Sequence, residues 1–270
     1  MTRKAKEKLI GKNERKAFRV ERPRGTAQAV IVCDHASNKI PKKLGSLGLK
    51  KADLQKHIAW DPGTEQIGRW LGRAMDATTV LAGYSRLVAD LNRGHDNKEC
   101  MRATSDGIKI PGNEKLSAHE KKQRLEEIFW PYHDAIDREL DRFLKKKTVP
   151  VLISIHSFTP RMQGKARPWH IGVMWNREER IARKLAKALR AQNPKLVIGE
   201  NKPYSLKSMS TGKDTIRRHA EDRGIPYIIV EFRQDLVGNK KSAEKFARIF
   251  YRALKEVLHD PNIYKRRKLR

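Results

Sequence analysis

Seven short apolar segments recur along the chain and predict the strands of a sheet. They are rich in Val, Ile and Leu and lie at Ala29–Cys33, Thr78–Leu81, Leu87–Leu91, Val149–Ile155, Ile171–Trp175, Leu196–Ile198 and Tyr227–Phe232. Several are apolar at consecutive positions, which is typical of strands buried on both faces of a largely parallel sheet. We therefore expect helices on both sides of this sheet.

The segments between the strands carry the apolar spacing of amphipathic helices. The predicted helices cover Gly63–Met75, Ser117–Lys147, Arg177–Ala191, Asp214–Arg223 and Lys241–Leu258. The longest should begin at a capping box of Ser117 and Glu120 and kink at Pro131. Because strands and helices alternate without a Gly/Ser linker or an internal repeat, the sequence predicts a single α/β domain with a mostly parallel or mixed central sheet.

The chain is strongly basic, with 60 Lys and Arg against 31 Asp and Glu and a formal net charge of +29. Residues 1–25 carry net +7 and residues 261–270 carry net +5. Such segments have much charge and little to bury, so we expect flexible basic tails around a folded domain at 26–260. The remaining positive charge is dispersed, which is typical of a solvated surface and would attract nucleic acid without reading its sequence.

Several classes of protein are disfavoured by what the sequence lacks. Its apolar runs are shorter than the ~18 residues of a membrane span, and the basic N-terminus is followed by no apolar stretch of signal-peptide length. Cys33 and Cys100 are the only cysteines, so we expect a cytoplasmic protein without a disulfide framework. There is no Walker loop, dinucleotide-binding glycine loop or Gly-x-Ser-x-Gly elbow, which argues against nucleotide cofactors and serine-hydrolase chemistry.

Polar side chains follow three predicted strands at their carboxyl ends, where ligands bind in open α/β sheets. The first strand is followed by DHASN at 34–38, a later strand ends in His156, and the last ends in Glu231. Two histidines and one carboxylate form a common ligand set of catalytic zinc, and Asp61 or Asn38 could complete it. From these residues alone, metal binding and a structural, hydrogen-bonded role for the histidines are equal alternatives.

A second polar cluster surrounds the predicted strand Leu87–Leu91, which is flanked by Arg86 and Arg93. A guanidinium group matches a carboxylate with two parallel hydrogen bonds, so an arginine beside a metal site suggests a substrate that bears a carboxylate. The alternative is that Arg86 pairs with Asp90 within the fold. Both interpretations of Arg86 follow from the pattern.

At these residues the chain resembles the N-formylglutamate amidohydrolase family. The resemblance covers about residues 28–237 and is carried, in order, by CDHASNKIP, HIAWDPGTEQI, YSRLVADLNR, IPGN, VLISIHSFTP, ARPWHIGVMWNR, RHAEDRGIPY and VEFRQDL. It implies a phosphorylase/hydrolase-like α/β fold, shared with zinc carboxypeptidase-like hydrolases. It also implies metal-dependent hydrolysis of the amide bond of N-formylglutamate or a similar small anionic N-acyl amino acid.

The resemblance implies a metal site for Zn²⁺, or for another divalent metal. His35 and His156 match the metal-site histidines of the family, and Asp61 is expected as the third ligand. Zinc carboxypeptidases use a His-x-x-Glu pair, whereas this chain has Asn38 at the position of that Glu. Asp61 is therefore preferred over Asn38.

The resemblance also implies roles for residues that would act on the substrate. Glu231 resembles the general base of those hydrolases. Asn92 and Arg93 resemble the pair that holds the substrate carboxylate, and Arg86 is a second candidate for that task.

Two other functions are compatible with the sequence. A nucleic-acid-associated protein would use the basic surface, although aromatic residues make up only 7% of the chain and no known binding module is visible. A non-catalytic metabolite sensor would keep the fold and the site without the reaction. The sequence does not define an oligomeric state.

Overall fold

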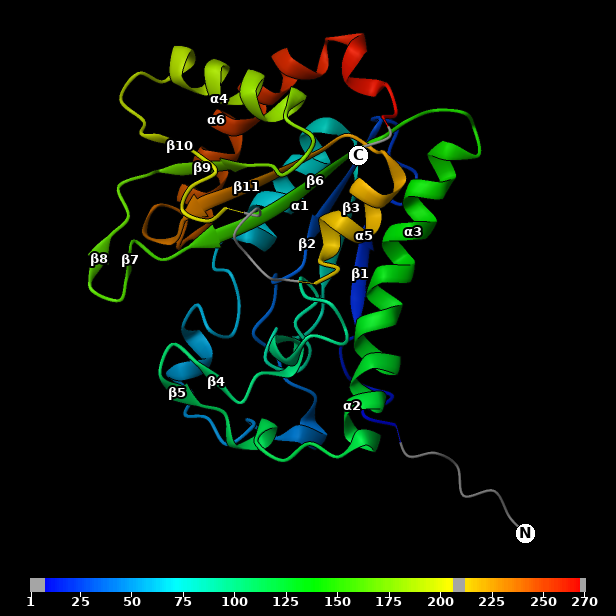
Figure 1. Ribbon diagram of the computed structural model, residues 1–270, viewed down its shortest axis with the longest axis vertical. Helices are drawn as coiled ribbons and strands as arrows, with labels where there is room; N and C mark the ends of the chain where they lie inside the picture. Colours follow the sequence, from blue (N-terminus) through cyan, green and yellow to red (C-terminus); the bar gives the residue numbers. More distant parts are fainter. Residues whose placement is uncertain (1–7, 206–211, 268–270) are drawn as a thin grey trace.

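Seven strands form one central sheet in the computed structural model, which describes residues 8–205 and 212–267 (Figure 1). The strands lie in the order β1-β3-β2-β6-β11-β9-β10. They are β1 (Phe18–Glu21), β2 (Ala29–Cys33), β3 (Thr78–Ala82), β6 (Val151–Phe158), β9 (Ile171–Met174), β10 (Ile198–Glu200) and β11 (Tyr227–Arg233). The four central strands β3, β2, β6 and β11 are parallel, whereas β1 runs antiparallel to β3 and β9 antiparallel to β11.

Six α-helices and two small hairpins complete the described fold. The helices are α1 (Thr64–Met75), α2 (Ala118–Arg124), α3 (Trp130–Leu144), α4 (Arg180–Gln192), α5 (Thr215–His219) and α6 (Lys240–Leu258). The hairpins pair β4 (Thr104–Ser105) with β5 (Ile108–Lys109), and β7 (Arg161–Met162) with β8 (Lys165–Ala166). The predicted single-domain α/β fold with a mixed sheet is confirmed.

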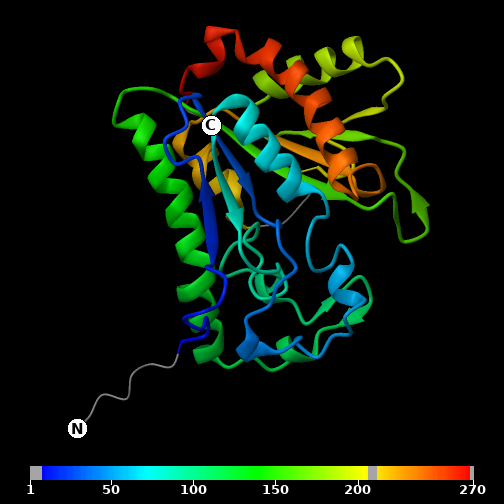
Figure 2. The ribbon, with the colours of Figure 1, turned by 180° about the vertical axis from the view of Figure 1, so that it is seen from behind.

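The two faces of the sheet are buried against different helices. Ile31 and Ile153 belong to the hydrophobic cluster that contains the apolar side chains of α1, α4 and α6. Val32 and Leu152, one position away on the same strands, belong to the cluster that contains those of α3. Figures 1 and 2 show α3 on one side of the sheet and α1 with α6 on the other. Because both faces are covered, consecutive strand positions are apolar, as the sequence predicted.

The predicted strand at Leu87–Leu91 is wrong. Turns occupy this segment, and Ser85 starts them: its Oγ accepts a hydrogen bond from the amide of Leu87, and its carbonyl accepts one from the amide of Val88. The apolar side chains of the segment are nevertheless buried. Burial of a loop beneath the site, rather than pairing in the sheet, explains its apolar character.

The boundaries expected for the basic tails also differ from the structure. Within the described residues, Leu9 is buried and the edge strand β1 pairs with β3. At the other end, Ile263 is buried against the α6 side of the sheet, and the amide of Arg267 donates to the carbonyl of Gly224. Described residues of both basic segments therefore contact the domain, through buried apolar side chains and through backbone hydrogen bonds.

The long helical segment begins at the predicted capping box of Ser117 and Glu120. A π-helical turn over Leu125–Phe129 separates α2 from α3, and Pro131 lies in the first turn of α3. The proline ring cannot accommodate the carbonyl of the preceding turn in a regular helix, and a π turn relieves that clash. No helix in the described ranges combines the length and apolar character required to cross a membrane.

Candidate active site

The register of two central strands places His156 beside Glu231. They are direct partners on the parallel strands β6 and β11, and both line a cavity of about 310 Å³ at the carboxyl end of the sheet. Ser154 and Ile229, two positions earlier on the same strands, line it as well. The alternation of side chains along a strand therefore delivers this set to one face.

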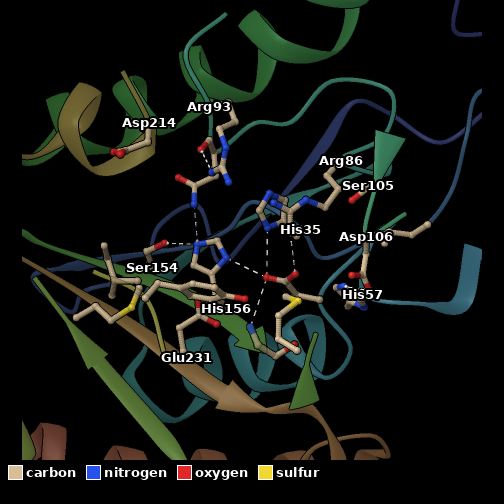
Figure 3. A pocket seen from close by; sticks show the side chains of 18 of the residues that line it. His35, His57, Arg86, Arg93, Ser105, Asp106, Ser154, His156, Asp214 and Glu231 are labelled. Atoms are coloured by element: carbon tan, nitrogen blue, oxygen red, sulfur yellow. Dashed lines mark hydrogen bonds and ion pairs between the residues drawn. The ribbon is translucent and has the colours of Figure 1, made fainter. Parts of the chain in front are cut away.

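His35 and Asp61 approach the same cavity from two loops. His35 follows β2, and Asp61 lies just before α1, where its amide donates to the carbonyl of His35 over 2.9 Å. The Thr64 hydroxyl donates to the Asp61 carbonyl over 2.7 Å. These contacts connect the end of β2 to the start of α1, and both side chains line the cavity. Figure 3 shows His35 close to His156 there.

His35, Asp61 and His156 form a buried cluster that could hold a metal ion. One ligand atom from each lies within 4.8 Å of the others. The Nδ1 atoms of His35 and His156 lie 3.2 and 3.0 Å from Oδ2 of Asp61. Two imidazole nitrogens and a carboxylate oxygen that converge in this way match the donors that zinc uses in catalytic sites.

The second ring nitrogen of each histidine, Nε2, contacts other side chains than Asp61. Nε2 of His35 lies 2.8 Å from Oδ1 of Asp90, and Nε2 of His156 lies 3.0 Å from Ser154 Oγ and 3.5 Å from Asp34 Oδ2. Metal-binding histidines commonly donate their second N–H to a carboxylate, which sets the tautomer and orients the ring. The supporting contacts therefore fit metal binding through both Nδ1 atoms.

The electrostatics of the cluster favour a bound cation. Burial alone would lower the pKa of His156, but its hydrogen bonds with Asp34 and Asp61 outweigh burial and raise that pKa to about 10. The carboxylates thus keep a proton on His156 at neutral pH in the absence of a metal. A divalent cation would supply the positive charge in place of that proton.

Glu231 is buried beside this cluster and is suited to exchange a proton. Its Oε2 has no hydrogen-bond partner among the described residues. Burial raises the pKa of Glu231 to about 7, the charge of His156 opposes that rise, and the charge of Asp61 adds to it. A carboxyl group with a pKa near neutrality can both accept and return a proton.

Three arginines line the cavity: Arg86, Arg93 and Arg102. The guanidinium of Arg86 donates to Asp90 over 2.8 and 3.1 Å and to Asp61 over 3.4 Å. Its pairing with Asp90, one of the two interpretations from the sequence, is therefore observed. Arg93 donates to the carbonyl of Asn92 over 2.8 Å and forms no ion pair with a carboxylate in the described part of the chain. Arg93 is thus the cation most available to an anionic ligand.

The structure brings together every residue that the sequence singled out for the site except Asn38. Metal, base and substrate-binding candidates all line the cavity, and Asn92 lies 3.5 Å from Nε2 of His156 through its Nδ2. Asn38 instead donates to the carbonyl of Leu54 and does not line the cavity. Of the two candidates for a third ligand, only Asp61 lies beside both histidines.

Sequence reasoning missed several residues of the cavity. His57 and Asp106 line it as a pair 3.5 Å apart, and Tyr204 lines the side near Glu231. Asp106 and Tyr204 lie in loops without a distinctive motif, whereas His57 opens the HIAWDPGTEQI stretch but is not marked there as a site residue. Asp34 belongs to the DHASN segment that follows the first strand, but the sequence does not show that its carboxylate lies 3.5 Å from Nε2 of His156.

The fold and the site define an α/β protein with a buried His-Asp-His cluster and an adjacent carboxyl group at the carboxyl edge of its sheet. The chain belongs to the N-formylglutamate amidohydrolase family, whose model matches residues 27–237. A similar protein is an N-formylglutamate deformylase from Pseudomonas putida, with 32% identity over 114 residues. This match covers 37% of the present chain and 43% of the relative's length.

Two solved structures share the fold over most of the chain. A gene product of Agrobacterium tumefaciens is 31% identical, has a TM-score of 0.88, and is matched over 93% of the present chain and 98% of its own. An N-formylglutamate amidohydrolase from Ralstonia eutropha has a TM-score of 0.69 at 15% identity, with 90% and 97% of the two chains matched. At that identity, the second likeness concerns the fold alone.

Proposed function

We propose that the protein is a metal-dependent amidohydrolase that removes a small acyl group, formyl being the case that the family indicates, from an anionic N-acyl amino acid such as N-formylglutamate. The observation that carries the proposal is the convergence of His35, Asp61 and His156 beside the buried Glu231. The family supplies the type of bond. The cavity of about 310 Å³ lies at the lower end of the range for small-molecule sites.

The cation would be zinc or another divalent metal, held by His35, Asp61 and His156. When bound, it would polarise the carbonyl of the scissile amide and make a water molecule more acidic. Glu231 would accept a proton from the attacking water and return it to the departing amine nitrogen. Its pKa of about 7 suits both transfers at neutral pH.

The arginines would orient the substrate. Arg93, whose guanidinium pairs with no carboxylate among the described residues, would bind a substrate carboxylate, and Asn92 would support it from the neighbouring position. Arg86 is already paired with Asp90 and Asp61, so its remaining N–H groups would contact the substrate as a weaker, second clamp. Fixing the carboxylate fixes the amide over the cation, which supports catalysis by orientation.

Two free, buried cysteines, Cys33 and Cys100, support a cytoplasmic location for this enzyme. The substrate class supports the same location, since small acylated amino acids are metabolites.

The test combines metal analysis with a hydrolysis screen of the purified protein. The substrates would be N-formyl and N-acetyl derivatives of glutamate, aspartate and leucine. We expect about one equivalent of divalent metal and the highest kcat/KM for N-formylglutamate. Absence of hydrolysis across the screen in protein loaded with zinc would contradict the proposal.

Glu231→Gln tests the base directly, because it keeps the size of the side chain and removes the proton acceptor. Metal content should stay unchanged while kcat falls by about 10² to 10⁴. Glu114→Gln is the matched control, since Glu114 is exposed and does not line the cavity. Wild-type turnover by Glu231→Gln with metal bound would assign the base to another carboxylate.

A further inference from the structure

A row of basic side chains runs along the solvent face of α6. We call these residues the α6 stripe: Lys241, Lys245, Arg248, Arg252 and Lys255. Alternate steps of four and three residues place them on one face of the helix, over a length of about 21 Å. The opposite face, with Phe246, Phe250 and Leu254, is buried in the core. The orientation of the stripe toward solvent is therefore fixed by packing.

Among the residues that the structure describes, the α6 stripe forms no ion pair, whereas most basic residues of the neighbouring helix α4 do. On α4, Arg183, Lys184 and Arg190 are paired with Glu179, Asp260 and Glu200 respectively. Within residues 8–205 and 212–267, no carboxylate lies within ion-pair distance of any member of the α6 stripe. The charges of α4 are thus largely compensated, whereas those of the α6 stripe are available to an external anion.

Four members of the stripe line an open groove of about 1240 Å³ between α1 and α6. The rings of Trp70 and Tyr251 line the same groove and meet edge to face, with centroids 5.9 Å apart. The guanidinium of Arg248 lies over the Trp70 ring, 5.0 Å from its centroid. Glu244 is the one acidic residue among those lining the groove. The groove therefore combines a linear array of cations with aromatic rings.

We propose that this groove binds the phosphodiester backbone of a nucleic acid without reading its sequence. A linear polyanion matches a row of uncompensated cations about 21 Å long, whereas a single small anion would engage only one or two of them. An anionic membrane is a poorer match, because the apolar face of α6 is buried in the core and is unavailable for insertion among lipids. The net charge of +29 would add long-range attraction.

The groove is separate from the candidate active site. Its walls belong to α1 and α6, which cover one face of the sheet, whereas His156 and Glu231 share the other face with Leu152 and Ile229. Figure 2 shows α1 and α6 side by side on the near face. Nucleic-acid binding would therefore be an additional activity, independent of amide hydrolysis.

The salt dependence of binding measures how many cations contact phosphates. With five contacts, log K should fall against log [salt] with a slope of about −3.5 for a single strand and about −4.5 for a duplex. Affinity for a fluorescent 20-nucleotide single strand should then drop by about 100-fold between 50 and 200 mM salt. Affinities for single-stranded RNA, single-stranded DNA and duplex DNA of one length would show which kind of nucleic acid the groove prefers.

The decisive comparison uses two double variants that lose equal charge. Lys245→Gln with Arg252→Gln removes two members of the stripe and should reduce the slope by about 1.4 on single strands. Lys145→Gln with Lys146→Gln removes two exposed charges at the end of α3, on the other side of the sheet, and should leave the slope unchanged. Circular dichroism melts would verify that both variants are folded.

Three results would overturn the proposal. Equal loss of slope in both double variants would assign binding to the overall charge of the protein. Binding to phosphatidylserine vesicles but to none of the three nucleic acids would assign the groove to membranes. Absence of any nucleic-acid binding at 50 mM salt would show that the groove is not a nucleic-acid-binding site.

Discussion

Asp90 connects the His-Asp-His cluster proposed to hold the metal with Arg86 and Arg102, and Asp90→Asn tests that connection. The side chain is fully buried. Its Oδ1 lies 2.8 Å from His35 Nε2, its Oδ2 accepts two hydrogen bonds from Arg86, and Arg102 lies 3.7 Å away. Burial would raise the pKa of Asp90, but Arg86 and His35 outweigh burial and hold that pKa well below its usual range. Asparagine keeps the shape of the Asp90 side chain and removes its negative charge.

The size of the effect follows from these contacts. Loss of the carboxylate that orients a metal-binding histidine weakens metal affinity by about 10- to 100-fold, or about 1.4 to 2.7 kcal/mol. Breaking a buried ion pair costs about 3 to 5 kcal/mol when the remaining charge is fully buried. The Arg86 side chain keeps 18% exposure and its contact with Asp61. We therefore expect the lower limit, a loss of about 3 kcal/mol in the free energy of unfolding.

Two assays separate these effects. Competition with a chromophoric chelator gives the zinc dissociation constant, and urea denaturation of the metal-free protein gives the free energy of unfolding. Glu99→Gln is the matched control: Glu99 lies 3.5 Å from Arg102 and is not among the contacts of His35. We expect this control to change zinc affinity by less than about twofold, since exposed ion pairs contribute little.

An Asp90→Asn protein that binds zinc as tightly as the wild type would refute the reasoning. That result would mean that the orientation of His35 is set by packing alone. A lower free energy of unfolding of Asp90→Asn with unchanged zinc affinity would lead to the same conclusion.

Three further predictions concern the substrate, the metal and the packing. Arg93→Ala should raise KM for N-formylglutamate by about tenfold and affect N-formylleucine amide much less, because the lost clamp binds a carboxylate; initial rates on both substrates check this. A strong chelator should abolish hydrolysis and lower Tm, and added zinc should restore both, since zinc at about 100 times its Kd stabilises by about 2.7 kcal/mol. Gly72→Ala should lower the free energy of unfolding by about 1 to 3 kcal/mol, as its Cβ would lie 2.4 Å from Oγ1 of Thr79; urea denaturation measures it.

Most of the architecture and much of the content of the site follow from the residue pattern along the chain. Consecutive apolar positions in strands such as Tyr227–Phe232 require cover on both faces, and parallel strands bring their carboxyl ends to one edge. For that reason the strand pattern alone predicts His35, His156 and Glu231 at one site. The motif around Asp61 added a further residue through the family resemblance.

The contacts that depend on loops and on side-chain direction could be established from the three-dimensional structure alone. The segment Leu87–Leu91 is as apolar as a strand, yet it is buried as a loop, because burial and not pairing sets the composition. The residue pattern alone left Asp61 and Asn38 as alternatives, and the turn at the start of α1 placed Asp61 between the histidines. On α4, Arg183 pairs with Glu179 one turn away, but Lys184 pairs with Asp260, which is distant in the sequence. Local sequence carries no information about such long-range partners.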